Sequence, residues 1–90
     1  MNSNHAATLS GIVLDAAGKP VAGARVYLVG APGPVPDMAA LTGDDGRFVL
    51  GAARAGRYEV ACRGDAGGSA SASVEVGALG AQVELRLGTR

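Results

Sequence analysis

The chain has 90 residues, enough for one small domain that buries about 60–65% of the surface its unfolded form exposes. Lysine plus arginine and aspartate plus glutamate number 8 each and no basic run occurs, which argues against a nucleic-acid partner or an anionic membrane surface. Cys62 is the single cysteine, so an internal disulfide and a cysteine-based zinc cluster are excluded.

The chain begins with a polar stretch, MNSNHAAT, and residues 1–7 are predicted to form a flexible tail. This start lacks the charged and apolar regions of a signal peptide. No apolar run in the chain approaches the roughly 20 residues of a membrane helix. We therefore expect a cytoplasmic protein with no membrane contact; export without a cleaved signal is the alternative.

Residues 8–88 alternate between apolar and polar or small side chains with a period of two, which is typical of half-buried strands. Six segments show this alternation, a seventh and weaker one lies near Met38 to Thr42, and glycine-rich turns separate them. The pattern predicts a single all-β domain, a seven-stranded sandwich. The side chains predicted to form its core are Val13, Val26, Leu28, Phe48, Leu50, Tyr58, Val60, Cys62, Val74, Val83 and Leu85.

The last segment is open to a second interpretation. Leu79, Val83 and Leu87 have the spacing of one face of a helix. Glycines punctuate this segment, however, and VELRL alternates cleanly, so a strand is the preferred prediction.

Two short segments with glycine as their fourth residue predict tight turns between strands: DAAGK (15–19) and GDDGR (43–47). Asp44 and Asp45 are the only adjacent carboxylates, but an aspartate in a turn bonds its own backbone, so the turn needs no ligand. A calcium loop would need oxygen ligands at alternating positions, where this chain has Arg47 and Phe48. The sequence therefore predicts no metal site.

Three stretches, SGIVLDAAGKPVAGARVYL, TGDDGRFVL and GRYEV, resemble the carboxypeptidase regulatory-like domain, a small transthyretin-like (prealbumin-like) β-sandwich. The resemblance covers residues 8–87 and consists mostly of turn and core positions. It implies seven strands in two sheets with a Greek-key-like order. It also implies a non-catalytic accessory role, because such modules sit beside enzymes, transporters or surface proteins.

The residues that catalysis would require are not present as a set. Transthyretin-like folds include hydroxyisourate hydrolases, which carry paired histidines, an arginine and a YRGS ending; this chain has His5 alone and ends LGTR. Cys62 is in phase with Tyr58 and Val60, which predicts a buried side chain rather than an exposed nucleophile. A glycosidase needs two carboxylates that face one glycosidic bond, and the sequence indicates no such pair. We therefore predict no enzymatic activity, no catalytic residue and no cofactor.

Apolar side chains also stand where the first two strands should face solvent. These candidate interface residues are Ile12, Leu14, Tyr27 and Val29. If the two strands pair, the four side chains form one apolar patch of the kind that marks interfaces. The stiff loop 30–40, with Pro34 and Pro36, either covers this patch or adds to the contact surface.

These observations favour a non-enzymatic protein-interaction or structural module, acting as a stand-alone adaptor, cap or decorating subunit of a larger assembly. The partner would be another protein or a second copy in a homo-oligomer. By analogy with other transthyretin-like domains, one alternative is an accessory component at the spike tip of a contractile injection machine. Another is a carbohydrate- or small-ligand-binding sandwich, which the absence of tryptophan and of paired exposed aromatic side chains disfavours.

Overall fold

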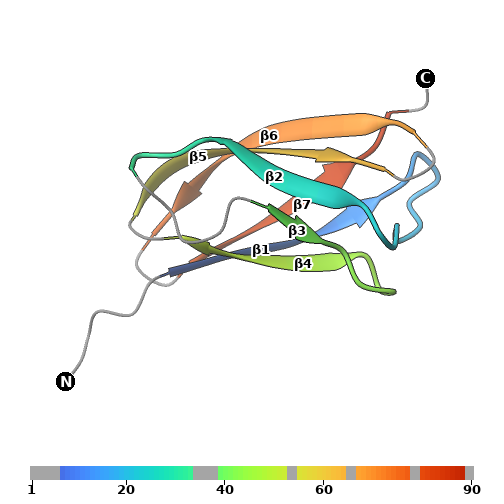
Figure 1. The fold of residues 1–90 in the computed structure, drawn as a ribbon, viewed down its shortest axis with the longest axis horizontal. Coiled ribbons are helices and arrows are strands. Elements are labelled where there is room, and N and C mark those ends of the chain that lie inside the picture. The colour runs from blue at the N-terminus through green and yellow to red at the C-terminus, as the bar shows by residue number, and fades with distance from the viewer. Residues whose placement is uncertain (1–6, 34–38, 53–54, 65–66, 78–79, 89–90) are drawn as a thin grey trace.

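The computed structural model describes residues 7–33, 39–52, 55–64, 67–77 and 80–88, which form seven strands (Figure 1). The strands are β1 (Ala7–Leu14), β2 (Arg25–Gly30), β3 (Ala39–Leu41), β4 (Arg47–Ala52), β5 (Gly56–Arg63), β6 (Ser69–Val76) and β7 (Ala81–Arg86). The predicted all-β architecture is confirmed, and the last segment is a strand rather than a helix. Of the described residues, none forms a helix with the length and apolarity needed to cross a membrane.

The strands form two sheets that face each other as layers (Figure 1). The three-stranded sheet has the order β4-β1-β7, and the four-stranded sheet has the order β3-β2-β5-β6. Neighbouring strands are antiparallel except for β1 and β7, which run parallel. The first and last strands of the domain are therefore hydrogen-bonded to each other in one sheet.

The condition for a single apolar patch, that the first two strands pair, is not met, because β1 and β2 belong to different sheets. After β1, the chain folds back only as far as Pro20 and Val21, where a bridge joins Leu14 to Pro20 and the Val21 N–H donates to the Val13 carbonyl at 2.9 Å. Proline has no N–H and cannot extend a strand ladder on that side. A turn with φ 72° at Gly23 then directs the chain into the opposite sheet.

The core lies between the two sheets and consists of the inward-facing side chains of six strands and their extensions. Its buried members are Leu9, Val13, Ala24, Val26, Leu28, Phe48, Leu50, Tyr58, Val60, Cys62, Val76, Leu85 and Leu87. Nine of the eleven predicted core residues are in this set, and the other two, Val74 and Val83, are partly buried and pack against it. Tyr58, not Phe48, is the largest fully buried side chain.

Both predicted turns are present, and one aspartate of each, Asp15 and Asp45, bonds the local backbone. The Asp15 carboxylate accepts hydrogen bonds from the N–H groups of Ala17 and Lys19, each at 2.9 Å. In the second turn, Asp45 accepts from the Arg47 N–H at 3.0 Å, and Gly46 has φ 77°. These two carboxylates are thus explained by the turns themselves, as the sequence predicted.

Candidate functional site

The structure separates the four predicted interface residues into two pairs. Ile12 and Leu14 are half-buried on the outer face of the three-stranded sheet, since Val13 between them is buried in the core. Tyr27 is half-buried and Val29 is 59% exposed on the outer face of the four-stranded sheet. The single four-residue patch is therefore wrong, because these faces point away from each other. Pro34 and Pro36 lie outside the described residues.

The outer face of the three-stranded sheet contains an open depression of about 500 Å³ around Ile12. Its rim carries charged side chains, because the register places Ile12 between Arg47 on β4 and Glu84 on β7. Each of these groups has an opposite charge nearby: Arg47 lies 3.7 Å from Asp45, and Glu84 lies 3.4 Å from Arg86. Arg47 and Glu84 on this face therefore already have partners of opposite charge within the domain.

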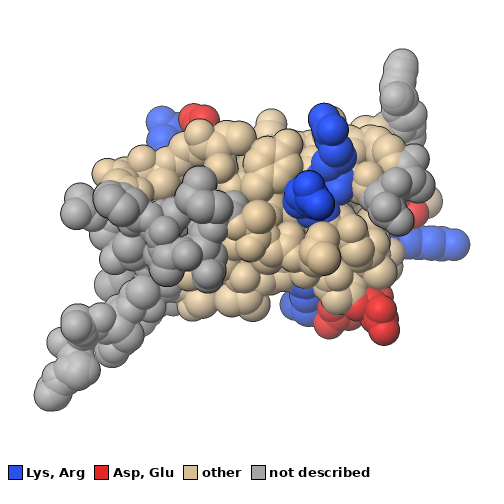
Figure 2. Space-filling model, in the orientation of Figure 1, with Lys and Arg blue, Asp and Glu red and all other residues tan. Residues whose placement is uncertain are grey.

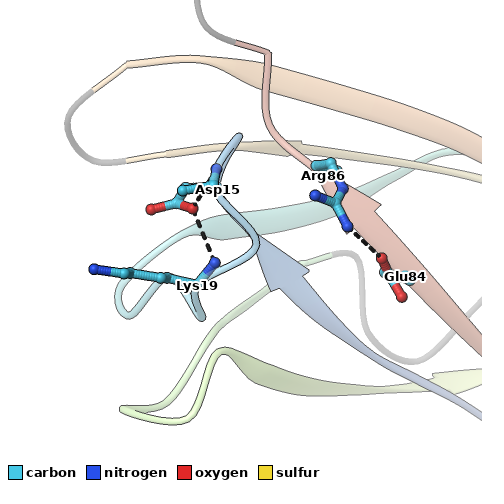
Figure 3. Close-up of polar contacts among 5 residues, drawn as sticks. Asp15, Lys19, Glu84 and Arg86 are labelled. Carbon is cyan, nitrogen blue, oxygen red and sulfur yellow. Dashed lines mark hydrogen bonds and ion pairs between the residues drawn. The ribbon is translucent and has the colours of Figure 1, made fainter.

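A second polar region lies at the end of the sandwich where β1 leaves the sheet (Figure 3). Figure 3 shows the Asp15 carboxylate turned back onto its own turn, while Glu84 and Arg86 contact each other along β7. The backbone N–H of Lys19, more than any other group, lowers the pKa of Asp15. A depression of about 740 Å³ at this end is lined mainly by small and apolar residues, and Asp15 is the charged one among the described residues that line it. These carboxylates therefore stabilise local structure.

The outer face of the four-stranded sheet differs, because two arginines stand opposite each other on neighbouring strands. Arg25 on β2 is the register partner of Arg63 on β5, and Leu41 on β3 is the partner of Arg25 on its other side. An open depression of about 420 Å³ is lined by these three side chains together with Gly23 and Gly64. Among the described residues, the ion pairs involve Arg47 and Arg86, and neither arginine of this pair has a carboxylate within 4.0 Å.

This arginine pair was not predicted from the sequence. Alternation places Arg25 and Arg63 on the outer side of their strands, but only the strand register brings them opposite each other. Leu41 was also missed, because its segment alternates weakly. It is 65% exposed, and with Val29 and Val49 it is one of the large hydrophobic side chains that the described structure leaves exposed.

The groups that could support catalysis or metal binding are dispersed in the described part of the chain. No cluster of three or more histidine, cysteine, aspartate or glutamate side chains occurs there. Cys62 is fully buried between the sheets, and this burial raises the pKa of its thiol.

Residues 8–88 match the carboxypeptidase regulatory-like domain, and the chain belongs to that family. Among solved structures, the chain is similar to the dioxygenase domain of a dioxygenase carbohydrate-binding protein fusion from the cellulolytic bacterium Streptomyces sp. SirexAA-E. The TM-score is 0.66 with 18% sequence identity, and the match covers 100% of this chain and 85% of that one. At this identity the likeness concerns the fold alone. No curated protein sequence matches the chain.

Proposed function

We propose that this domain is a non-enzymatic protein-interaction module that docks through the outer face of its four-stranded sheet. The docking face is defined by five outward side chains: Arg25, Tyr27, Val29, Leu41 and Arg63. The observation that carries the proposal is the exposure of its two large aliphatic side chains, 59% for Val29 and 65% for Leu41, on a face whose two arginines have no ion pair among the described residues. In this role the domain acts as an adaptor, cap or decorating subunit of a larger assembly.

The composition of the docking face supports this proposal. Tyrosine and arginine are over-represented among the residues that dominate binding energy at protein interfaces, and apolar side chains fill the centre of such contacts. Tyr27 lies beside two alanines in the register, Ala39 and Ala61, so its ring has no large neighbour in its own row. The outer face of the other sheet has its charges paired internally, which leaves less for a partner to gain there.

Carbohydrate binding has less support, although the structural neighbour comes from a carbohydrate-binding fusion. Sugar rings bind proteins by stacking on exposed aromatic faces. Of the three aromatic side chains, Phe48 and Tyr58 are buried in the core, and only Tyr27 is partly accessible. A single half-buried ring makes a weak platform, so a protein partner is the better-supported ligand.

The test compares two exposed aliphatic side chains on opposite faces. Leu41 on β3 and Val49 on β4 are 65% and 61% exposed, and both lie on edge strands. We expect Leu41→Ser and Tyr27→Ser to abolish complex formation in co-purification or self-association in light scattering, while Val49→Ser behaves as wild type. All three variants should keep the β-sheet circular dichroism spectrum. Equal behaviour of Leu41→Ser and Val49→Ser, or no complex with any variant or the wild type, would contradict the proposal.

A further inference from the structure

The arginine pair on the docking face, Arg25 and Arg63, places two positive charges opposite each other in the isolated domain. Arg25 and Arg63 are direct cross-strand partners on one face of an antiparallel pair. Residues in such positions have Cβ atoms about 4.5–5.5 Å apart, and like charges there destabilise a sheet. Both side chains are exposed and point away from the core, so neither contributes to its packing.

The other described arginines each lie near or opposite an acidic side chain, which makes Arg25 and Arg63 an exception. Arg47 and Arg86 each have a carboxylate within 4.0 Å, and Arg57 stands opposite Glu75 in the register. In Figure 2, basic side chains gather over the face that carries β2, and no red, acidic side chain of the described residues is visible next to them. The chain as a whole is neutral, so the positive charge here is local and not part of a general basic surface.

The shape of the site suits a carboxylate better than a phosphate backbone. A guanidinium group binds a carboxylate through two parallel hydrogen bonds, and two such groups can hold one carboxylate from both sides. Gly23 and Gly64 line the same depression and carry no side chain that would block the approach. A nucleic acid would require a row of cationic side chains along its backbone, whereas this face offers one pair and then the apolar Leu41.

We infer that Arg25 and Arg63 form a carboxylate-binding clamp for an acidic segment of the partner protein, in which an apolar side chain next to the acidic one packs on Leu41. This inference rests on the proposed function and specifies the chemistry of the partner. Binding would remove the like-charge repulsion of the free domain, because the partner's carboxylate neutralises part of the positive charge at Arg25 and Arg63.

The test is an NMR titration of the full ¹⁵N-labelled chain with a synthetic peptide of alternating glutamate and leucine. We expect saturable shifts in the backbone amides near Gly23, Arg25 and Arg63. Arg25→Gln or Arg63→Gln should weaken binding at least about tenfold, because a charge-assisted hydrogen bond is lost. Arg47→Gln, which removes an arginine already paired on the opposite sheet, should bind as wild type. The same peptide with glutamine in place of glutamate should not bind.

Thermal unfolding gives a second, independent measurement. Removing one of two facing like charges should raise the melting temperature of Arg63→Gln by roughly 1–5 °C. A lower melting temperature would mean that Arg63 serves an internal ion pair and would overturn the inference. So would the absence of saturable shifts, equal loss of binding in Arg47→Gln, or tighter binding of a single-stranded oligonucleotide at the same amides. If the peptide fails while Leu41→Ser still abolishes complex formation, the docking face stands and only the carboxylate clamp is wrong.

Discussion

Thr42 is the one buried polar side chain of the described residues, and its hydroxyl bonds the chain segment between β1 and β2. Its Oγ1 accepts a hydrogen bond from the Ala24 N–H at 2.8 Å and donates one to the Val21 carbonyl at 2.6 Å. Its backbone also pairs with Ala24 and Gly23. Thr42 thus stabilises the connection between β1 and β2, next to Gly23, which lines the same depression as Arg25.

Replacing Thr42 tests this role directly. Thr42→Val keeps the shape but leaves the Ala24 N–H and the Val21 carbonyl without their side-chain partner, so we expect a loss of about 1–3 kcal/mol of stability. Thr42→Ser keeps the hydroxyl and should recover most of the difference. Urea unfolding of the three proteins provides the comparison. Equal stability of the valine and wild-type proteins would mean that the hydroxyl group contributes nothing.

The alkylation rate of the Cys62 thiol measures whether solvent and reagents reach the core next to β5. Burial raises the pKa of its thiol, so the folded state favours the neutral form, and the thiolate that reacts with alkylating reagents is both scarce and shielded. We expect native protein to react many times more slowly than protein in denaturant, where the thiol is exposed. Because the folded pKa lies above the unfolded one, stability should fall as the pH rises past the ordinary pKa of a thiol. Equal native and denatured rates would place Cys62 outside the core.

At the level of elements, the period-two pattern predicted the strands well because each strand buries one face and exposes the other. The burial of β5 alternates residue by residue, with Tyr58, Val60 and Cys62 inside. Periodicity carries no information on which strands share a sheet. That choice depends on the short connection after β1, where Pro20 and Gly23 redirect the chain, and it explains why the four predicted interface residues lie on two different faces.

Gly23 and Gly46 have nearly the same φ angle but differ in how much space surrounds them. Alanine substitutions at the two positions therefore separate the conformational cost of a positive φ from the cost of steric crowding. Gly23 has φ 72° and Gly46 has φ 77°. A Cβ atom at Gly23 would meet no atom within 4 Å, whereas one at Gly46 would lie 2.8 Å from the Val13 carbonyl oxygen and 3.0 Å from Pro20. The second turn therefore packs directly on the end of β1, and its glycine is required for space as well as for conformation.

We expect Gly23→Ala to cost about 1 kcal/mol, because alanine disfavours the left-handed region. Gly46→Ala should cost at least about 1 kcal/mol more, since the backbone of β1 must move to admit the methyl group. Denaturant unfolding of both variants measures the difference. Should the two alanine variants be equally stable, the contact between the turn and Val13 would be looser than the structure describes.

At the scale of the whole molecule, the two sheets present chemically different outer faces. The sequence predicted that apolar side chains would be exposed, and Val29 is indeed exposed. It could not predict the arginine pair, because Arg25 and Arg63 are far apart in the chain and meet only through the β2–β5 register. The proposed docking face combines side chains from β2, β3 and β5, so it requires the four-stranded sheet to have formed.

The three-stranded sheet also depends on distant segments, since its central strand β1 pairs with β7 at the other end of the domain. β7 and its extension bury Leu85 and Leu87, which are 1% and 6% exposed. Together these two side chains stabilise the fold by about 3–6 kcal/mol. That is a large share of the roughly 5–15 kcal/mol that holds a small domain folded. Without β7, the central strand would also lose its parallel hydrogen bonds.

We therefore expect a fragment of residues 1–80 to be unfolded by circular dichroism, and a synthetic peptide of residues 81–90 to restore the β-sheet spectrum when added in excess. The peptide supplies the missing strand and both leucines, so recovery should be saturable and should follow the peptide concentration. A peptide carrying Leu85→Asp is the matched control and should not restore folding, because the charge would be buried between the sheets. Cooperative unfolding of the fragment alone would show that β7 is dispensable. The domain would then be held together mainly by the four-stranded sheet that carries the docking face.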